Sequence, residues 1–304
     1  MELEFDTLDV FTDRRFAGNP LAVVHGADGL DTAAMQTIAR EFNLSESVFV
    51  MKPDNPAHSA KIRIFTPAME LPFAGHPTVG TAVLLAELRV GDEARDTDSL
   101  VVLEEQIGVV RVGVKLRRNG AGFAEFDAPK LPEDSGPAPD VQLLAPAVGL
   151  EPSEIGFANH RPTHYSAGVP FTFLPVSSLA VMARAQIQAG HWANAFGSAR
   201  AGKMSLYCRE TIASSSAFHV RVFAPAAGVP EDPATGSAAA AFAGVIHRFD
   251  GLRDGHHKQL IEQGFEMGRP SHIAVGMEVE GGKLANVRIG GSAVRVSAGK
   301  VRVR

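Results

Sequence analysis

Two proton-handling side chains, His76 and Asp232, stand in two similar phrases about half the chain apart. The phrases read GHPTVGTA and EDPATGSA. When Pro77 is aligned with Pro233, His76 falls opposite Asp232, and an apolar run follows in both phrases. Proline is favoured in the first turn of a helix, where its missing N–H costs no hydrogen bond. The sequence therefore predicts two helix starts, one with an imidazole and one with a carboxyl group at its tip.

The starts of these two helices could bind one anionic ligand together. A helix start exposes unpaired N–H groups and the positive end of the helix dipole, which hold a carboxylate or a phosphate. Thr235, Gly236 and Ser237 stand near the second start, and Gly75 stands at the first. If the two halves face each other, both starts converge on a shared cleft. The alternative is a pair of plain capped helices, because Asp is a favoured N-cap.

A third candidate is Glu46, in the segment NLSESV directly before the apolar stretch 48–50. A carboxyl group at a strand edge in a closed apolar cleft has a raised pKa. Such a group can take up and return a proton near neutral pH. The alternative is an ordinary solvated loop glutamate, since Glu is mostly exposed in proteins.

Other motifs are incomplete. The segment 197–203 fits a phosphate-binding loop but lacks the Ser or Thr that would follow its lysine. His160 and His164 have a metal-ligand spacing, yet Pro162 argues against the helix that would place both on one face. Cys208 is the single cysteine, in an apolar stretch, and is predicted to be a buried small hydrophobe. These patterns predict neither a nucleotide nor a metal site.

Further pairs of similar segments, which occur in the same order in both halves, indicate a duplicated module. The phrase IRIFTP precedes the first motif and VRVFAP the second, and AGNP near the N-terminus resembles AGVP in the second half. A chain of 304 residues exceeds a typical single domain of roughly 100 to 200 residues. The stretch 127–140 is rich in proline and acidic residues, as linkers are. The sequence predicts domains at 1–128 and 129–304, with a last strand that can cross to the first domain.

Each half combines many short strands with one or two helices, which predicts an α+β fold. Apolar alternation and turn residues predict strands, and helical spacing with caps predicts helices. The expected strands include 3–11, 21–24, 48–50, 62–65, 100–103, 108–116 and 171–176, and the expected helices are 31–42, 77–88 and 179–192.

Composition narrows the class of protein. Hydrophobic residues make up 45% and charged residues 21% of the chain, with a formal net charge of −5. The basic residues are scattered, so no electrostatic footprint for nucleic acid is expected. No run reaches the roughly 18 apolar residues of a membrane helix, and the acidic N-terminus does not resemble a signal peptide. With one cysteine, the chain fits a reducing, cytoplasmic environment.

Together these phrases resemble the PhzF-like phenazine-biosynthesis isomerase family, a branch of the diaminopimelate epimerase-like superfamily. The matching phrases include DVFT, FAGNPLAV, NLSES, ELPFAGHPT, EDPATGSA, EQG and GRPS, in order over nearly the whole chain. The resemblance implies two similar domains, each a curved mixed sheet around a central helix, with the active site between them. It also implies an isomerase without a cofactor, usually a homodimer, that acts on a small carboxylate-bearing substrate.

The resemblance also implies residue roles. Related epimerases use one cysteine at each helix tip, and here those positions look like His76 and Asp232. In the phenazine enzyme, the glutamate that matches Glu46 moves a proton along a dihydro-hydroxyanthranilate ring. His76 and Asp232 would assist it as catalytic residues; the expected substrate-binding residues are Asn19, Gly75, Thr235, Gly236 and Ser237. The alternatives are an amino-acid racemase or epimerase and a non-catalytic metabolite-binding protein.

Overall fold

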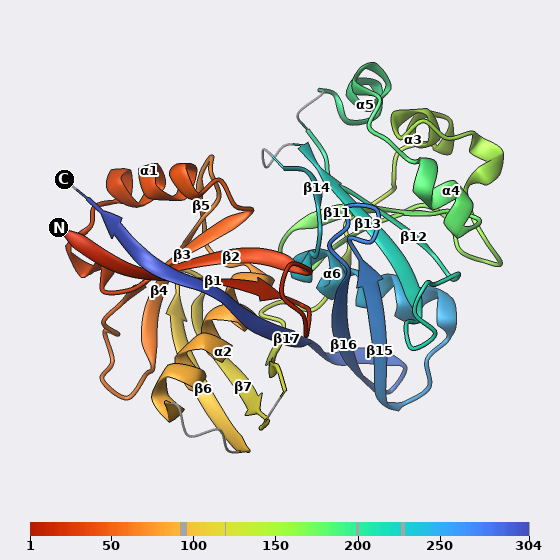
Figure 1. Ribbon diagram of the computed structural model, residues 1–304. Helices are drawn as coiled ribbons and strands as arrows, with labels where there is room; N and C mark the ends of the chain where they lie inside the picture. Colours follow the sequence, from red (N-terminus) through yellow and green to blue (C-terminus); the bar gives the residue numbers. More distant parts are fainter. Residues whose placement is uncertain (92–95, 119, 199–200, 226–228, 304) are drawn as a thin grey trace. The chain divides into compact units, whose positions relative to one another are not determined.

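The computed structural model describes residues 1–91, 96–118, 120–198, 201–225 and 229–303 (Figure 1). The chain forms two compact units, Met1–Asp127 with Gly290–Arg304, and Ala128–Ile289. The sequence assigned 129–304 to one domain and left open where the last strand belongs. Residues 290–304 join the first unit, because the end of the chain pairs antiparallel with the N-terminal strand from Glu2 opposite Arg302 to Val10 opposite Ala293.

The first unit is a mixed sheet that closes on itself. Its strand order is β17, β1, β2, β3, β4, β6, β7, β8, and β8 pairs again with β17. The pairs β2–β3 and β4–β6 are parallel and the other pairs from β1 to β8 are antiparallel. The strands are β1 (Glu2–Val10), β2 (Asn19–Val24), β3 (Glu46–Met51), β4 (Ala60–Phe65), β5 (Glu70–Leu71), β6 (Thr97–Glu105), β7 (Gly108–Leu116), β8 (Gly122–Asp127) and β17 (Lys283–Arg302).

The helix α2 (Gly75–Val90) is the core of this unit, and its first ten residues are all buried. The helix lies close to the sheet because its residues are small: a Cβ atom at Gly80 would come within 2.7 Å of both Leu21 and Val10. The helix α1 (Thr32–Phe42) and the short helix η1 (Ala27–Gly29) pack with the sheet in a second apolar cluster that contains Phe49. The sheet therefore has a helix on each face.

The second unit repeats this plan. Its strands pair in the order β9, β10, β11, β12, β13, β15, β16, and the central helix α6 (Gly236–Asp250) is mostly buried. The strands are β9 (Glu133–Asp134), β10 (Thr163–Ser166), β11 (Pro170–Pro175), β12 (Met204–Cys208), β13 (Phe218–Ala224), β14 (Val229–Asp232), β15 (Gly255–Gln263) and β16 (Ser271–Glu280). The remaining helices are α3 (Val141–Ala147), η2 (Pro152–Glu154), α4 (Leu179–Arg184) and α5 (Ala189–Phe196).

One predicted helix is wrong. The segment 179–192 forms two helices, α4 and α5, with an extended residue at Ala185 between them. The break is stabilised by backbone hydrogen bonds from Gln186 N to Val148 O and from Gln188 N to Ala147 O. The end of α3 therefore provides the carbonyl acceptors for these two N–H groups. In a continuous helix, the preceding turn would have provided them. The predicted linker 127–140 contains a short strand, β9, which pairs with β10.

The strand register shows how the two halves correspond. In the first unit, β4 pairs with β5 so that Ile64 lies opposite Leu71. In the second unit, β13 pairs with β14 so that Val222 lies opposite Asp232. Because IRIF matches VRVF, Asp232 is the counterpart of Leu71. Asp232 is therefore not the counterpart of His76.

The two central helices confirm this register. The helix α2 begins at Gly75, five residues after Glu70, and α6 begins at Gly236, five residues after Glu231. The residue after each helix start is His76 in one half and Ser237 in the other. The alignment of Pro77 with Pro233 is thus wrong by five residues. The proline at 233 follows a short strand, as Pro72 does, and it precedes the helix.

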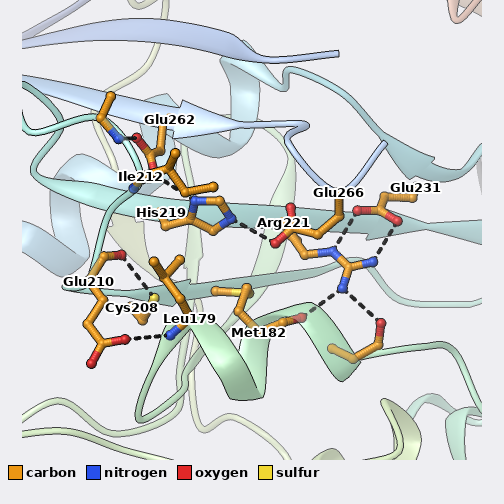
Figure 2. Close-up of polar contacts among 12 residues, drawn as sticks. Leu179, Met182, Cys208, Glu210, Ile212, His219, Arg221, Glu231, Glu262 and Glu266 are labelled. Atoms are coloured by element: carbon orange, nitrogen blue, oxygen red, sulfur yellow. Dashed lines mark hydrogen bonds and ion pairs between the residues drawn. The ribbon is translucent and has the colours of Figure 1, made fainter. Parts of the chain in front are cut away.

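A repeated ion pair supports the same correspondence. Arg63 binds Glu70 through Nε at 2.7 Å and a terminal nitrogen at 2.6 Å. Arg221 binds Glu231 in the same forked way, at 2.8 and 2.9 Å, as Figure 2 shows. Such two-pronged arginine–carboxylate pairs fix geometry as well as charge. Each pair ties the strand before a central helix to its neighbour.

Candidate active site

Glu46 and His76 lie together in the first unit. Glu46 is the first residue of β3, and His76 is the second residue of α2. The distance from His76 Nε2 to Glu46 Oε2 is 3.4 Å, and the two side chains are 5% and 17% exposed. The strand β3 runs parallel to β2, with Glu46 opposite Leu21, whose side chain reaches α2 at Gly80. The fold thus places a half-buried carboxyl group beside an imidazole at a helix start, as the sequence predicted for each separately.

The imidazole of His76 is neutral. Burial lowers the pKa of His76 to about 3, and the positive end of the helix dipole acts in the same direction. Its Nε2 has no hydrogen-bond partner among the described residues, so the 3.4 Å approach to Glu46 is a close contact and not an ion pair. The neutral form is favoured because a buried imidazole loses more hydration on protonation than this site returns.

We expect His76 to stay neutral across the working pH range. In ¹³C and ¹⁵N NMR of histidine-labelled protein, its ring resonances should not titrate between pH 5 and 9, whereas an ordinary histidine titrates near 6.5. Because the folded pKa lies below the unfolded one, the unfolded chain binds the extra proton. Stability due to His76 is thus complete above pH 6.5 and is lost as the pH falls toward 3. A ring titration near neutral pH would contradict this assignment.

The second unit holds a polar cluster around Asp232. Thr235 Oγ1 donates to Asp232 Oδ2 at 2.5 Å. Gln263 Nε2 donates to Asp232 O at 2.7 Å and to Thr235 Oγ1 at 3.1 Å, while Thr235 N donates to Gln263 Oε1 at 3.1 Å. Gln263 is only 1% exposed. The clamp formed by Gln263 fixes the turn between β14 and α6.

This cluster corrects the sequence analysis in two ways. Asp232 and Pro233 precede α6, whose N-cap is Thr235, so Asp232 is neither the N-cap nor at the helix tip. Gln263 was not among the predicted site residues. The phrase EQG, which is one of the phrases shared with the family, contains Gln263 and could have identified it. Gly264 in the same phrase has a φ of +78°, and a Cβ atom there would lie 2.6 Å from Pro233 O. A side chain at that glycine would push the clamp away from the turn.

The other predicted binding residues lie at element starts. Asn19 begins β2 and is fully buried, and Gly75 begins α2. Gly236 and Ser237 are the first two residues of α6, where Ser237 is partly exposed. Gly75, Gly236 and Ser237 thus lie among the backbone N–H groups of a helix start, whereas Asn19 lies at the start of a strand. The expected common cleft for both clusters stays a prediction.

Of the weaker motifs, His160 has a structural role in the second unit. His160 contacts Tyr207 at 3.1 Å and Asp250 at 3.2 Å and stacks on Phe157. Residues 199 and 200 of the segment resembling a phosphate-binding loop lie outside the described residues. Within the described ranges, no three His, Cys, Asp or Glu side chains are placed to hold a metal ion. Nor does any described helix have the length and apolar character needed to span a membrane.

Cys208 is unsuited to acid–base catalysis. It is buried in the strand β12, and its Sγ donates to Glu210 O at 3.3 Å (Figure 2). Burial, reinforced by the charge of Glu210, raises its pKa to about 12. A thiol of this kind is protonated at neutral pH and is inert. The two positions at the helix starts carry His76 and Ser237, so neither has the cysteine of the two-thiol epimerases.

The comparisons with known proteins agree with this architecture. The model of the phenazine biosynthesis-like protein family (PhzC-PhzF) matches residues 8–299. The chain belongs to this family. An uncharacterized isomerase of Mesorhizobium japonicum is 54% identical in an alignment of 301 residues, which covers 96% of this chain and 96% of that one. The trans-2,3-dihydro-3-hydroxyanthranilate isomerase of Pseudomonas aeruginosa is 35% identical in an alignment of 296 residues, which covers 96% of this chain and 97% of that one.

Solved structures of PhzF-family proteins share the fold. The crystal structure of the PhzF-family phenazine biosynthesis protein of Bacillus anthracis superposes with a TM-score of 0.87, at 27% identity, over the whole of both chains. A hydroxyproline epimerase of Agrobacterium vitis superposes with a TM-score of 0.62 at 14% identity, which shows a common fold alone. The predicted family and the α+β fold are thus confirmed.

Proposed function

We propose that this PhzF-family protein is a cofactor-independent isomerase that moves a proton on a small carboxylate-bearing metabolite. The substrate class we propose is that of trans-2,3-dihydro-3-hydroxyanthranilate, the compound named for the Pseudomonas relatives. The observation that carries the proposal is the half-buried carboxyl group of Glu46, 3.4 Å from the neutral imidazole of His76 at the start of α2. Glu46 serves as the general acid and base.

The reaction needs one proton-carrying group. The Glu46 carboxylate accepts a proton from a ring carbon beside the unsaturated system, and the electron pair of the C–H bond enters that system. The same carboxyl group then returns the proton to another carbon, so no electron leaves the substrate and no oxidant is required. The negative charge that develops is stabilised by the N–H groups at the start of α2. A carboxyl group suits this task when its pKa is near the working pH.

The neutral state of His76 suits a supporting role. A cationic histidine next to Glu46 would stabilise the carboxylate and lower its pKa. A neutral imidazole leaves the carboxyl group free to hold the proton between the two half-reactions. We assign His76 to keeping the Glu46 carboxyl oriented through Nε2, since this atom is already within 3.4 Å of Oε2.

Binding roles remain for the other predicted residues. The start of α6, with Gly236 and Ser237, offers backbone N–H groups to a substrate carboxylate. Asp232 and Thr235, fixed by the Gln263 clamp, offer a carboxylate to an amino group or a hydroxyl group of the substrate. We also propose, from the family resemblance, that the protein acts as a homodimer in the cytoplasm. Light scattering after gel filtration measures the oligomeric state.

The proposal is tested by following the substrate in D₂O. Purified protein, treated with a chelator, is incubated with trans-2,3-dihydro-3-hydroxyanthranilate, and ring protons are followed by NMR. We expect product at a rate proportional to enzyme concentration. It should carry solvent deuterium at the carbon that receives the proton, because the partly exposed Glu46 carboxyl group exchanges its proton with solvent. Binding of the compound without exchange or isomerisation, measured by calorimetry, would instead favour a non-catalytic binding protein. Reactivity restored only by an added metal would contradict the absence of a cofactor.

A further inference from the structure

A second carboxyl group, Glu105, is buried beside the helix that carries His76. It is the last residue of β6 and is 8% exposed. Its Oε1 lies 2.8 Å from Thr78 Oγ1, and its Oε2 has no hydrogen-bond partner among the described residues. Thr78 lies in the first turn of α2, two residues after His76, and its hydroxyl is also 2.8 Å from Ala74 O. The proposed mechanism makes no use of this carboxyl group.

The repeat identifies the counterpart of Glu105. In the first unit, β4 and β6 pair with Lys61 opposite Glu104. In the second unit, β13 and β15 pair with His219 opposite Glu262. Since the phrases IRIF and VRVF correspond, Lys61 corresponds to His219 and Glu104 to Glu262. The next residue along each strand is Glu105 in one half and Gln263 in the other.

The contacts of Glu104 and Glu262 support this correspondence. The carboxylate of Glu104 accepts hydrogen bonds from Asp54 N and Asn55 N at 2.7 and 2.9 Å and contacts His58 Nδ1 at 2.7 Å. The carboxylate of Glu262 accepts hydrogen bonds from two successive backbone N–H groups, of Ile212 and Ala213, and contacts His219 Nδ1 (Figure 2). Both halves therefore use this glutamate in the same way, and the following residue occupies the same place beside a central helix.

The amide of Gln263 acts there as a hydrogen-bond donor. Its Nε2 donates to Asp232 O and to Thr235 Oγ1, before the start of α6. An ionised carboxylate at Glu105 could only accept, whereas a protonated carboxyl group can also donate. Thr78 has one hydroxyl proton and two oxygens at 2.8 Å. If that proton goes to Ala74 O, the second contact requires a proton on Glu105.

Among the residues that the structure describes, no cation offsets a charge at this position. On the neighbouring strands, the residues that share the inner face are apolar, and they are Ile62, Ile64, Val110 and Val112. Lys61, Arg63, Glu104 and Arg111 occupy the alternate positions, which face the other side of the sheet. On α2, the titratable group in the first turn is the neutral His76. Burial raises the pKa of Glu105 to about 8, against the opposing effect of its bond to Thr78.

We propose that Glu105 is a positioning residue whose neutral carboxylic acid fastens the first turn of α2 and so holds His76 against Glu46. In this role it is the acid equivalent of the amide of Gln263 in the other half. Ionisation of Glu105 would remove the donated hydrogen bond and leave an unpaired charge in an apolar site. Its effect on activity rests on the proposed function, whereas its effect on stability does not.

The sign of the pH effect follows from the two states. The pKa of Glu105 rises from 4.5, the ordinary value, to about 8 on folding. Between these values the folded protein keeps a proton that the unfolded chain has released. Stability from Glu105 is therefore complete below pH 4.5, falls as the pH rises, and is lost above about 8. A glutamine cannot titrate, so it removes this dependence.

The test compares the wild type with Glu105→Gln, Glu105→Ala and the neighbouring control Glu104→Gln. The melting temperature of Glu105→Gln, relative to that of the wild type, should increase from pH 5 to about pH 8 and then level off. The infrared difference spectrum of the wild type minus Glu105→Gln should contain the band of a protonated carboxylic acid at pH 7 and should lack it at pH 10. Glu104→Gln should keep the band, because the pKa of Glu104 is lowered to about 2 by Asn55 N, Asp54 N and His58.

Activity provides the second readout. We expect Glu105→Gln to retain at least half of the wild-type rate of solvent exchange at pH 7, and Glu105→Ala to lose tenfold or more. The wild-type rate should fall above pH 8, and the rate of Glu105→Gln should not. A pH-independent difference in melting temperature, together with no infrared band, would overturn the proposal. If the wild type shows no exchange at all, the proposed function fails, and the infrared and melting results alone decide the state of Glu105.

Discussion

Replacement of Glu46 by Gln should lower the rate of solvent exchange by about 10²- to 10⁴-fold, which is the usual contribution of a general acid or base. The amide has the shape of the carboxyl group but cannot carry the proton between two carbons. The melting temperature should change little, because Glu46 lies at the edge of β3 and is partly exposed. The measurement is deuterium incorporation in D₂O by NMR, with substrate concentration varied so that kcat and KM are separated.

The control for this variant is Glu41→Gln. Glu41 is an exposed residue of α1, five positions before Glu46, so the same loss of charge occurs away from His76. Its exchange rate should equal that of the wild type. Undiminished exchange in Glu46→Gln would remove Glu46 from the mechanism. A rise in KM with unchanged kcat would make Glu46 a binding residue instead.

Replacement of Glu262 by Ala should destabilise the protein by about 3–5 kcal/mol, as is typical when one partner of a buried charged pair is removed. Glu262 is fully buried, and its carboxylate accepts from Ile212 N at 2.6 Å and Ala213 N at 2.9 Å and contacts His219 Nδ1 at 2.7 Å. Burial alone would lower the pKa of His219, but its bonds to Glu266 and Glu262 raise it above the ordinary value. The variant leaves the imidazole and two N–H groups without this acceptor. Urea unfolding measures the loss.

The first half supplies a matched control. Glu104→Ala removes the same kinds of contact, to two backbone N–H groups and a histidine, but at a site that keeps 13% side-chain exposure. Water can reach the freed groups there, so its loss of stability should be clearly smaller. Equal losses in the two variants would show that burial is not what makes Glu262 important. A loss under about 1 kcal/mol, which is typical of an exposed pair, for Glu262→Ala would contradict the prediction.

The duplicated scaffold carries different chemistry in its two halves. Ser47 lies opposite Phe65 in the first unit, and Met204 lies opposite Phe223 in the second. Because the phrases IRIF and VRVF correspond, Phe65 matches Phe223, and Ser47 therefore matches Met204. The counterpart of Glu46 is therefore Lys203, whose Nζ lies 5.6 Å from the centre of the Phe171 ring. A lysine side chain has no carboxyl group, so it cannot serve there as a carboxylate base. Of these two corresponding positions, only the one in the first half has a carboxyl group, which is consistent with the proposed one-carboxylate isomerase.

The sequence by itself determined the family, the duplication and the two residues of the first cluster. These features depend on local phrases: NLSES places Glu46 at a strand start, and GHPT places His76 at a helix start. Cap and turn chemistry acts over a few residues, so it can be read along the chain. The register of the repeat could not be read in this way. Two phrases aligned on their prolines looked alike, and the pairing of Ile64 with Leu71 and of Val222 with Asp232 showed that they were out of register.

Only the tertiary structure decided the charge states and the supporting contacts. His76 is neutral because the protein surrounds it, and Glu105 was overlooked because nothing in the local sequence distinguishes it from the adjacent Glu104. One of these two glutamates faces the central helix and the other faces away, since side chains alternate along a strand. The clamp from Gln263 to Asp232 likewise joins residues 31 positions apart. Burial and strand register exist only in the folded sheets. The side chains proposed as acids and bases therefore acquire their charge states and contacts only when each sheet has formed around its central helix.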